Sequence, residues 1–410
     1  MLTSLDLFAG CGGLSIGMGW AGIENISAVE SWQPAANAFS LNHPASNVYN
    51  IDAREFVSAV QSKASGFPKR NDADIIIGGP PCQGFCGINR HRNVNDPRNS
   101  LFEVYLDCIT ALMPKALVIE NVNGILSLNG GIAIIEAIQY LKELGYTADF
   151  RVLQAGSFGV PQNRWRVILI AVKGVSKIIF PEQLHAFHRT VVFDVAKYKD
   201  KVLYPQTVSD DMFSKLLPEI KVTDAISDLP DISNGACYSG GFNKVATGAY
   251  SRILRGNEIE VFDHECMNLG PVNMERVVCL KPDSGDGWTS LPENLKPQNL
   301  VRFGGNRFGN RFARLQWDGG FSTILTKPEP YWGRVIHPRQ DRLISVRESA
   351  RAQGFPDSAK FYGILRDKYK MVGNAVPPPL GRSVGWALRK TLGDKSVDDE
   401  IREYGNAFKT

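Results

Sequence analysis

The fold is decided by a strand that runs into a glycine-rich turn, at residues 4–14, which read SLDLFAGCGGL. Residues 4–8 have the character of a short strand, and a helical pattern begins at Gly13 and continues to Ala21. Glycines at positions 10, 12 and 13 let the backbone approach a ligand closely, and the first turn of a helix offers free N–H groups. The stretch therefore predicts a nucleotide-cofactor turn, although a tight turn that binds nothing is the alternative.

A second glycine pattern, GMGWAG at residues 17–22, matches the dinucleotide-binding motif G-x-G-x-x-G. It falls inside the predicted helix, whereas that motif works only at the turn between a strand and a helix. The turn itself, at residues 10–13, lacks a third glycine at the required spacing. These two observations argue against an enzyme that uses a nicotinamide or a flavin.

The alternation of short apolar runs and helical patterns continues to residue 172. Further strands are predicted at residues 26–30, 48–51, 74–77, 116–119, 148–153 and 167–172. Helices are predicted between them, at residues 13–21, 34–41, 53–61, 100–112 and 132–144. This order predicts an α/β fold, with a mostly parallel sheet and helices on both faces, and such sheets bind ligands at the carboxyl ends of their strands.

The character of the sequence changes after about residue 180. Residues 181–330 are rich in Gly, Asn, Pro and Asp and lack the strand-helix rhythm, so we expect a separate domain of short strands and loops. Regular structure returns near Val335, with helices predicted at residues 346–353 and 377–388. A chain of 410 residues is long enough for two or three domains.

The composition places the chain among globular proteins and leaves its partners open. Hydrophobic residues make up 43% of it, which excludes disorder over most of the chain, and no run of about 18 apolar residues predicts a membrane span. The net charge of +4 neither requires nor excludes a nucleic acid. Seven scattered cysteines without a Cys-x-x-Cys pair, and no secretory signal, indicate a reducing compartment without a disulfide framework or a metal site.

Polar residues follow the second and third predicted strands. Glu30 ends the second strand and Trp32 follows it, so a carboxylate can accept from both hydroxyls of a ribose and an indole can pack on an adenine ring. Asp52 follows the third strand and either accepts from an adenine amino group or caps the next helix. With the glycine turn, these strand ends predict a nucleoside pocket without a pyrophosphate clamp, which fits S-adenosylmethionine.

The fourth strand leads into GGPPCQGFC at residues 78–86, which places Cys82 at the ligand edge of the sheet. Pro80 and Pro81 fix the backbone before Cys82, and the stretch that follows, up to Asn99, has the composition of a mobile lid. A lone cysteine is more often a small buried apolar residue than a nucleophile. The context of Cys82 therefore favours a catalytic role more than its residue type does.

Two further polar stretches lie at the ends of later strands. Glu120 ends the fifth strand within the sequence Glu-Asn-Val, on the strand edge next to Cys82. Arg164 and Arg166 stand two residues apart in QNRWR, residues 162–166, so on an extended segment they point the same way. Either they approach a phosphate and a base carbonyl group, or both are solvated.

Residues 3–172 and 335–388 resemble the C5-cytosine DNA methyltransferases, because six sequence motifs of that family occur in the right order. The motifs lie at residues 6–13, 78–86, 120–122, 162–166, 347–356 (RESARAQGFP) and 373–379 (GNAVPPP). The chain resembles in particular the catalytic module of maintenance-type CpG methyltransferases, and this similarity extends into residues 224–230 and 314–330. The cysteine-rich zinc cluster of vertebrate members is missing, so no metal is carried over.

The resemblance implies a Rossmann-like methyltransferase sheet that binds S-adenosyl-L-methionine and is interrupted by an irregular domain of strands and loops. Residues 1–180 and 335–410 would form one discontinuous catalytic and cofactor-binding domain. Residues 181–334 would form a target-recognition domain. The C-terminal helix of the family completes the cofactor pocket, to which Asn374 and Val376 would contribute.

The resemblance also implies the reaction, DNA (cytosine-5-)-methyl transfer in double-stranded DNA, with CpG as the expected target. A cytosine is flipped out of the duplex, Cys82 adds to ring position 6, and the methyl group of S-adenosyl-L-methionine passes to position 5, leaving S-adenosyl-L-homocysteine. Glu120 would hold the ring N3 and amino group, and Arg166 would bind the ring carbonyl oxygen. Arg164 would support the lid or a backbone phosphate.

Two further sets of residues are predicted to bind the cofactor and the DNA. The cofactor set is Phe8, Ala9, Gly10, Gly12, Gly13, Leu14, Glu30, Ser31, Trp32, Asp52, Ala53, Pro80, Asn374 and Val376. The DNA set is Gln83, Arg302, Arg307, Arg311 and Arg314. The arginines alternate with aromatic residues, a mixture that suits a DNA groove or, alternatively, a solvated loop over a small core. We expect a monomer that binds duplex DNA and no membrane, in the nucleus of a eukaryote or otherwise in the cytoplasm or nucleoid.

Two other functions remain open on the sequence alone. A relative in this family methylates transfer RNA with the same core, but its Cys-Phe-Thr signature is not visible here, and the long insertion suits a duplex. The second is a catalytically inactive DNA-binding scaffold, and such proteins usually lose the nucleophile or the cofactor acid. This chain keeps Cys82, Glu120, Glu30 and Asn374, which favours an active enzyme.

Overall fold

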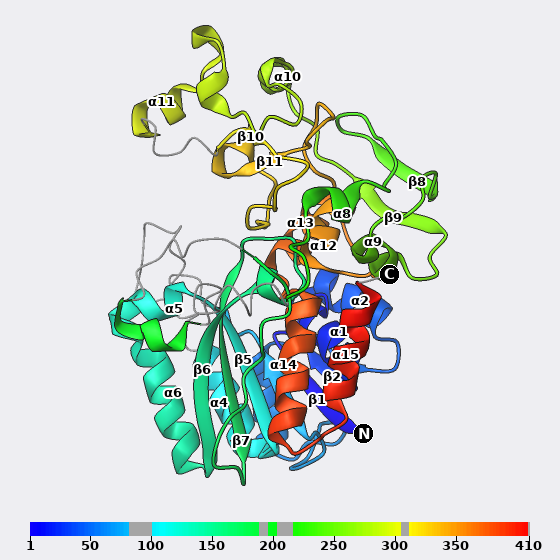
Figure 1. Cartoon of the computed structure of the whole chain (residues 1–410). Coiled ribbons are helices and arrows are strands. Elements are labelled where there is room, and N and C mark those ends of the chain that lie inside the picture. Colours follow the sequence, from blue (N-terminus) through cyan, green and yellow to red (C-terminus); the bar gives the residue numbers. More distant parts are fainter. Residues whose placement is uncertain (82–100, 188–195, 203–215, 305–310, 409–410) are drawn as a thin grey trace. The chain divides into compact units, whose positions relative to one another are not determined.

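A computed structural model of the chain describes residues 1–81, 101–187, 196–202, 216–304 and 311–408 (Figure 1). The chain forms two compact units, each with a hydrophobic core of its own. The first unit comprises Met1–Phe158, Trp165–Pro218 and Val376–Asn406, and the second Gly159–Arg164, Glu219–Ala375 and Ala407–Thr410. Across the described ranges, no helix combines the length and the apolar character needed to cross a membrane.

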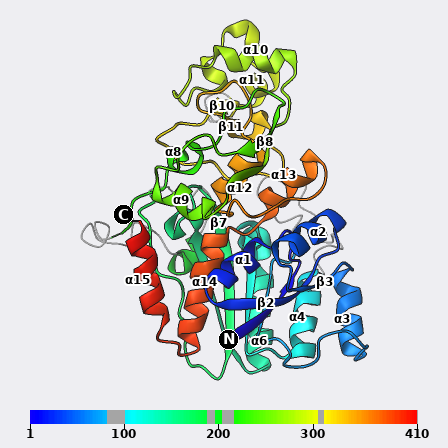
Figure 2. The same ribbon diagram turned by 90° about the vertical axis from the view of Figure 1, so that its right-hand side faces the viewer.

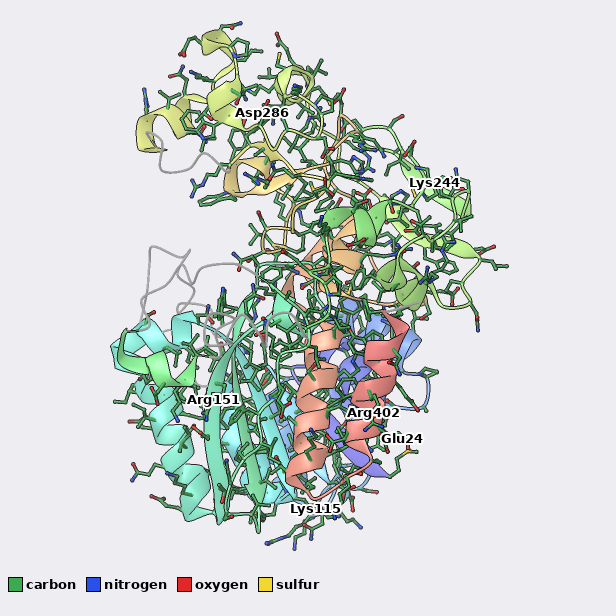
Figure 3. All side chains as sticks on the ribbon, in the orientation of Figure 1. Glu24, Lys115, Arg151, Lys244, Asp286 and Arg402 are labelled. Atoms are coloured by element: carbon green, nitrogen blue, oxygen red, sulfur yellow. The ribbon has the colours of Figure 1, made fainter. Side chains whose placement is uncertain are left out.

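A seven-stranded sheet in the order β3-β2-β1-β4-β5-β7-β6 forms the centre of the first unit. Its strands are β1 (Leu2–Leu7), β2 (Ile23–Val29), β3 (Asn47–Tyr49), β4 (Ile75–Gly78), β5 (Ala116–Val122), β6 (Tyr146–Gln154) and β7 (Trp165–Lys173). Neighbouring strands are parallel, except that β7 runs antiparallel to β5 and β6. The carboxyl ends of β1, β2, β4 and β5 therefore share one edge, and Lys115, ion-paired with Asp74 at 2.7 Å, marks the opposite edge (Figure 3).

Helices cover both faces of this sheet (Figure 1). Three of them, α3 (Ala53–Gln61), α4 (Leu101–Leu112) and α6 (Ile132–Glu143), bury apolar side chains in the core on one face. On the other face, α1 (Gly13–Trp20) and α14 (Pro378–Thr391) lie side by side in both views, and α15 (Val397–Ala407) packs on α14 through Trp386 (Figure 2). The predicted α/β fold is thus confirmed.

Glycines set the close approach of α1 to α14. A Cβ atom at Gly17 would lie 2.3 Å from the carbonyl oxygen of Pro378, and one at Gly385 would lie 2.6 Å from the Cβ of Ala21. Both distances are shorter than real contacts, so only glycine permits this packing. Gly17 belongs to the GMGWAG pattern, so at this position the pattern serves the packing of two helices.

The second unit consists of short helices, loops and two small sheets, which agrees with the irregular domain that the sequence predicted. Its helices are α8 (Val222–Ile226), α9 (Ala249–Arg255), α10 (Pro271–Cys279), α11 (Gln298–Gly304), α12 (Val346–Gln353) and α13 (Leu365–Asn374). One sheet pairs β8 (Cys237–Gly241) with β9 (Glu260–Glu265) in antiparallel fashion, and the other pairs β10 (Ala313–Arg314) with β11 (Arg334–Ile336) in parallel.

Buried ion pairs attach α12 to the rest of the second unit. Arg351 binds the carboxylates of Asp228 and Asp357 at 2.6 Å each, and all three side chains are almost fully buried. Removing either partner of such a pair would leave an uncompensated buried charge, so α12 is firmly held there. The boundary of this unit, after residue 375, therefore does not coincide with the predicted boundary at residue 334. The roles assigned to the two predicted domains stay predictions.

Candidate active site

The glycine-rich turn between β1 and α1 has the backbone that its glycines predict. Gly10 and Gly12 have φ angles of 57° and 87°, and Gly12 is the N-cap of α1. Phe8 also has a positive φ, 60°, which is uncommon outside glycine and is frequent at functional sites. A Cβ atom at Gly10 would meet no other described atom within 4 Å, so a ligand can approach the backbone there.

Glu30 directly follows β2, and its carboxylate holds the glycine-rich turn. One oxygen accepts the N–H of Gly10 at 2.8 Å, and the other accepts the N–H of Trp32 at 2.7 Å. Asn50 donates to the backbone carbonyl of Glu30 at 2.7 Å and fixes the end of the strand. Trp32 is partly buried and begins the helix α2 (Gln33–Asn42) as its N-cap. Three residues predicted to bind a cofactor are therefore brought together.

The other predicted residues of the turn surround this centre. Ala9, Gly13 and Leu14 are buried, Phe8 is partly buried and Ser31 is exposed. The carboxylate, the open backbone at Gly10 and the neighbouring indole fit a ribose with an attached adenine. In the part of the chain that the structure describes, no three His, Cys, Asp or Glu side chains are grouped as metal ligands.

A buried carboxylate beneath the turn was not among the predicted site residues. Asp6 in β1 is 1% exposed and accepts a hydrogen bond from the hydroxyl of Ser15 at 2.6 Å. Burial raises the pKa of Asp6 to about 7; the bond from Ser15 opposes this shift, and the charge of Glu30 adds to it. The signal in the sequence is a carboxylate between two leucines in a strand, which places it on the opposite face from those leucines.

Asp52 caps α3. Its Oδ1 accepts the N–H of Arg54 at 2.8 Å, and the guanidinium of Arg54 lies 3.4 Å from its Oδ2. The sequence left two roles open for Asp52, and the cap is the one that the structure contains. The side chain is 42% exposed and so remains accessible to a ligand, while Ala53 behind it is buried. The adenine contact of Asp52 stays a prediction.

Glu120 and Arg166 form an ion pair at the carboxyl end of β5. The Nε of Arg166 lies 2.7 Å from Oε1 of Glu120, and the two side chains are 11% and 10% exposed. The antiparallel register of β5 and β7 pairs Val122 with Arg166 and so brings the two side chains together. Opposite charges at this distance and burial fix each other's orientation. The two residues predicted to hold a cytosine ring therefore lie side by side.

The backbone that leads to Cys82 is held against the end of β5. Asn121 is buried and donates from Nδ2 to the carbonyl oxygen of Pro80 at 3.1 Å. A Cβ atom at Gly79 would lie 3.1 Å from Oε2 of Glu120, so glycine leaves room for that carboxylate. Cys82 itself lies outside the described residues. Asn121, which the sequence analysis did not assign, is thus a positioning residue, and its signal was its place between Glu120 and the end of the strand.

Arg164 is buried, which contradicts the predicted contact with a DNA phosphate, whereas its predicted support of the lid involves residues outside the described ones and stays a prediction. The residue is 1% exposed, and its guanidinium donates to the carbonyl oxygens of Ile324 at 3.2 Å and of Gly373 and Ala375 at 3.0 Å. A group enclosed in this way holds the backbone on both sides of Asn374. The sequence could not show these contacts, because the carbonyl groups follow Arg164 by 160 to 211 residues.

The remaining predicted cofactor residues lie at two places. Asn374 is the exposed last residue of α13 in the second unit. The preceding Gly373 allows a tight approach, since a Cβ atom there would lie 2.4 Å from the backbone of Leu325. Val376 belongs to the first unit, where its side chain is nearly buried, and Pro80 is buried at the end of β4.

The predicted DNA-binding arginines fall into different environments. Arg314 is fully buried and donates to the carbonyl oxygens of Leu280, His337 and Gln340, so its assignment to DNA is corrected to a structural role. The sequence could not show this, because its partners lie 23 to 34 residues away.

Two of these arginines are accessible. Arg302 is exposed on α11, and the guanidinium of the partly exposed Arg311 lies 5.2 Å from the ring centre of Trp332. Trp332 is itself 54% exposed, so this stacked pair offers charge and an aromatic face to a partner. Gln83 and Arg307 lie outside the described residues.

The fold and the site agree with a comparison against known families. Methyltransferases that use an adenosyl cofactor have three features in common with this chain. They have polar residues at the carboxyl edge of the sheet, a glycine turn without a pyrophosphate clamp and an acid after the second strand. Residues 2–390 match the family described as C-5 cytosine-specific DNA methylase. The chain belongs to this family.

Curated relatives extend over most of this chain. It is 34% identical to DNA (cytosine-5)-methyltransferase 1 of Mus musculus over 95% of its length, and to DNA (cytosine-5)-methyltransferase PliMCI of Paracentrotus lividus over 98%. It is also 34% identical to DNA (cytosine-5)-methyltransferase 2 of Arabidopsis thaliana over 96%. The chain spans only 28–29% of the length of these relatives.

Solved structures share the fold. A prophage-encoded protein of E. coli described as a DNA modification methyltransferase has a TM-score of 0.68 at 23% identity, over 96% of this chain and 100% of that one. The Dnmt2 methyltransferase of S. pombe has a TM-score of 0.52 at 16% identity, again over 96% and 100%. At these identities the similarity establishes the fold alone.

Proposed function

We propose that this chain is a DNA (cytosine-5-)-methyltransferase, which transfers a methyl group from S-adenosyl-L-methionine to cytosine in double-stranded DNA and releases S-adenosyl-L-homocysteine. The observation that carries the proposal is the Glu120–Arg166 pair, which stands beside the strand leading to Cys82. A carboxylate next to a guanidinium complements the edge of cytosine, where an amino group, a ring nitrogen and a carbonyl oxygen lie in a row. Membership of the family supports the same reaction.

The cofactor would lie at the glycine-rich turn, where it supplies a methyl group on a positively charged sulfur. Glu30 would accept the ribose hydroxyls, because an ionised carboxylate has about four lone-pair sites and two of them already accept the N–H groups of Gly10 and Trp32. The indole of Trp32 would pack on the adenine ring. Asp52 would accept its amino group, and Asn374 would contribute from the end of α13.

The chemistry of the base explains why Cys82, Glu120 and Arg166 are needed together. Position 5 of cytosine is a weak nucleophile, so the thiolate of Cys82 first bonds to position 6 and moves an electron pair to position 5, which takes up the methyl group. Glu120 holds the ring N3 and amino group, and Arg166 stabilises negative charge at the ring carbonyl. Loss of the proton from position 5 and departure of the thiolate then restore the ring.

A cytosine stacked in a duplex cannot enter this site, so the target would be flipped out at a cost of a few kcal/mol. We assign the selection of the target to the second unit, because Arg302 is exposed there and the partly exposed Arg311 lies over an accessible indole, Trp332. CpG is the expected target, from the similarity to maintenance-type enzymes. The proposed form is a monomer on duplex DNA, in the nucleus of a eukaryote or on the nucleoid of a prokaryote.

Methyl transfer from labelled S-adenosyl-L-methionine tests the proposal. Duplex DNA with CpG should be methylated at least about tenfold faster than other contexts, because reading one base pair is worth roughly 1–3 kcal/mol. Cys82→Ser should abolish transfer and leave cofactor binding intact, whereas Cys86→Ser, the matched control, should keep activity. Bisulfite sequencing of randomised DNA after treatment identifies the preferred site. Methylation of transfer RNA alone, or DNA binding without cofactor binding, would replace the proposal by the RNA enzyme or by an inactive scaffold.

A further inference from the structure

Helix α2 is linked to the glycine-rich turn at both of its ends, through Glu30 at its beginning and directly at its end. At its beginning, the N–H of Trp32 donates to Glu30, whose other carboxylate oxygen accepts the N–H of Gly10. At its end, Asn42 and His43 contact the same turn. A helix of ten residues is about 15 Å long, so α2 fastens the turn at two separated points.

The end of α2 contacts two successive carbonyl groups of the turn. Asn42 donates from Nδ2 to the carbonyl oxygen of Cys11 at 3.3 Å. The Nε2 of His43 lies 3.4 Å from the carbonyl oxygen of Gly12. Both distances are long for hydrogen bonds, so packing must contribute to holding the turn as well.

The imidazole of His43 provides that packing. A Cβ atom at Gly12 would lie 2.5 Å from its Nε2 and 2.8 Å from its Cδ2, so the ring occupies the space of a side chain at position 12. The ring also stacks on Phe39, with 4.3 Å between ring centres. Burial lowers the pKa of His43, so the ring is neutral at pH 7 and has one N–H to donate.

Contacts that preorganise the turn should increase the affinity for the cofactor. Residues 8, 10 and 12 all have positive φ angles, a combination that a free chain seldom adopts. A ligand that had to impose this shape would lose affinity to the ordering of the backbone. The contacts from α2 remove that loss before the ligand arrives.

We propose that Asn42 and His43 are positioning residues of the cofactor site, which hold the carbonyl side of the glycine-rich turn in the shape that receives the adenosyl cofactor. The inference rests on the proposed function, because it takes S-adenosyl-L-methionine as the ligand of the turn. Glu30 holds the N–H side, and the end of α2 holds the opposite side. Neither Asn42 nor His43 belongs to the reacting groups, so they govern the affinity for cofactor and leave the rate at saturation unchanged.

Calorimetric titration of the full chain with S-adenosyl-L-homocysteine, together with steady-state kinetics, tests this. His43→Ala should raise the cofactor Kd and KM about five- to tenfold, with kcat within about twofold of the wild type. His43→Gln should restore most of the affinity, because its amide N–H can reach the carbonyl of Gly12. Asn42→Ala should raise Kd about two- to fivefold. Asn37→Ala is the control on the same helix, since it loses an exposed bond from Gln33 and, among the described residues, no contact with the turn.

A pair of substitutions separates the packing of His43 from the backbone of Gly12. Gly12→Ala meets three obstacles, the clash with the imidazole, an approach of 3.1 Å to Cδ2 of Phe39 and the φ of 87°, and should nearly abolish cofactor binding. Adding His43→Ala removes the clash with the imidazole and leaves the φ obstacle and the approach to Phe39, so the double variant should bind more tightly than Gly12→Ala alone. Independent effects would instead make the double variant weaker than either single one.

Three results would count against the inference in different ways. Unchanged cofactor affinity in His43→Ala, with normal binding by the wild type, overturns it and leaves the proposed function standing. A joint fall of kcat, affinity and melting temperature that His43→Gln does not reverse assigns His43 a merely structural role and also overturns it. A wild-type chain that binds no S-adenosyl-L-homocysteine overturns the proposed function itself.

Discussion

Replacing Glu30 by glutamine tests the proposed cofactor site, because it changes the charge and the hydrogen bonding of this side chain and leaves its shape nearly the same. The carboxylate accepts two backbone N–H groups, from Gly10 at 2.8 Å and from Trp32 at 2.7 Å. A glutamine at this position presents one oxygen and one NH₂ group, so one of the two N–H donors would face another donor. The substitution thus removes a charge and one acceptor without removing volume.

The size of the effect follows from these two bonds. A hydrogen bond to a charged group contributes about 1.5–3 kcal/mol, and an unsatisfied buried partner costs a similar amount. The free energy of unfolding of Glu30→Gln should therefore fall by about 1–3 kcal/mol. The ribose hydroxyls would lose the same acceptor, so the Kd for S-adenosyl-L-methionine should rise by about 10- to 150-fold, which corresponds to about 1.5–3 kcal/mol.

Isothermal calorimetry measures the affinity, and denaturant unfolding without cofactor measures the stability. Glu24→Gln is the matched control, because Glu24 lies near the start of the same strand with an exposed side chain and should change neither quantity (Figure 3). A cofactor Kd within twofold of the wild type in Glu30→Gln would refute the assignment of the ribose to this carboxylate. A loss of stability without a loss of affinity would restrict Glu30 to shaping the turn.

Arg166→Lys should lower kcat by about 10²–10³-fold with unchanged cofactor affinity, because an ammonium cannot bind Glu120 and the ring carbonyl together as a guanidinium does. Single-turnover kinetics measure this rate, and a rate within tenfold of the wild type would contradict the prediction. Arg311→Ala should weaken DNA binding or relax the preference for sequence context, at unchanged melting temperature. Arg314→Ala should instead lower the melting temperature, because it leaves buried carbonyl groups unpaired. Salt-dependent DNA binding and thermal unfolding measure the two effects, and equal behaviour of the two variants would refute the distinction. Burial lowers the pKa of His185 to about 4, so the folded chain resists its protonation, and stability that is present above pH 6.5 should be lost as the pH falls toward 4, by on the order of 3 kcal/mol. Urea unfolding across this range measures the effect, and an equally steep pH dependence in His185→Gln would show that another group is responsible.

Residues at strand ends could be predicted from the sequence because local chemistry and one topological rule decide them. The glycine turn requires positive φ angles, and a polar residue just after a buried parallel strand must emerge at the carboxyl edge. Glu30 and Glu120 satisfied this rule, and both lie at that edge next to partners that the sequence also named. Asp52 shows the limit of this rule. The rule predicts where a carboxylate lies, but it does not predict whether that carboxylate caps a helix or binds a ligand.

Contacts between distant segments could not be predicted in the same way. Arg164 is enclosed by carbonyl groups that follow it by 160 to 211 residues, and the contacts of Asn42 and His43 with the turn span 31 residues. An arginine pattern in the sequence is the same whether its guanidinium meets a phosphate or a buried backbone.

The ion pair at the end of β5 determines how a substrate could be received. Arg166 uses Nε for Oε1 of Glu120 and Nη1 for the carbonyl of Trp165, so its plane is fixed before any base arrives. The second carboxylate oxygen, Oε2, lies on the side of Gly79, where a Cβ atom would approach it to 3.1 Å. Electrostatic stabilisation is greatest where donors and acceptors need no rearrangement during the reaction. In the proposed reaction, therefore, the base must adapt to Oε2 and the guanidinium, and even an alanine at position 79 should impair methyl transfer through the orientation of Glu120.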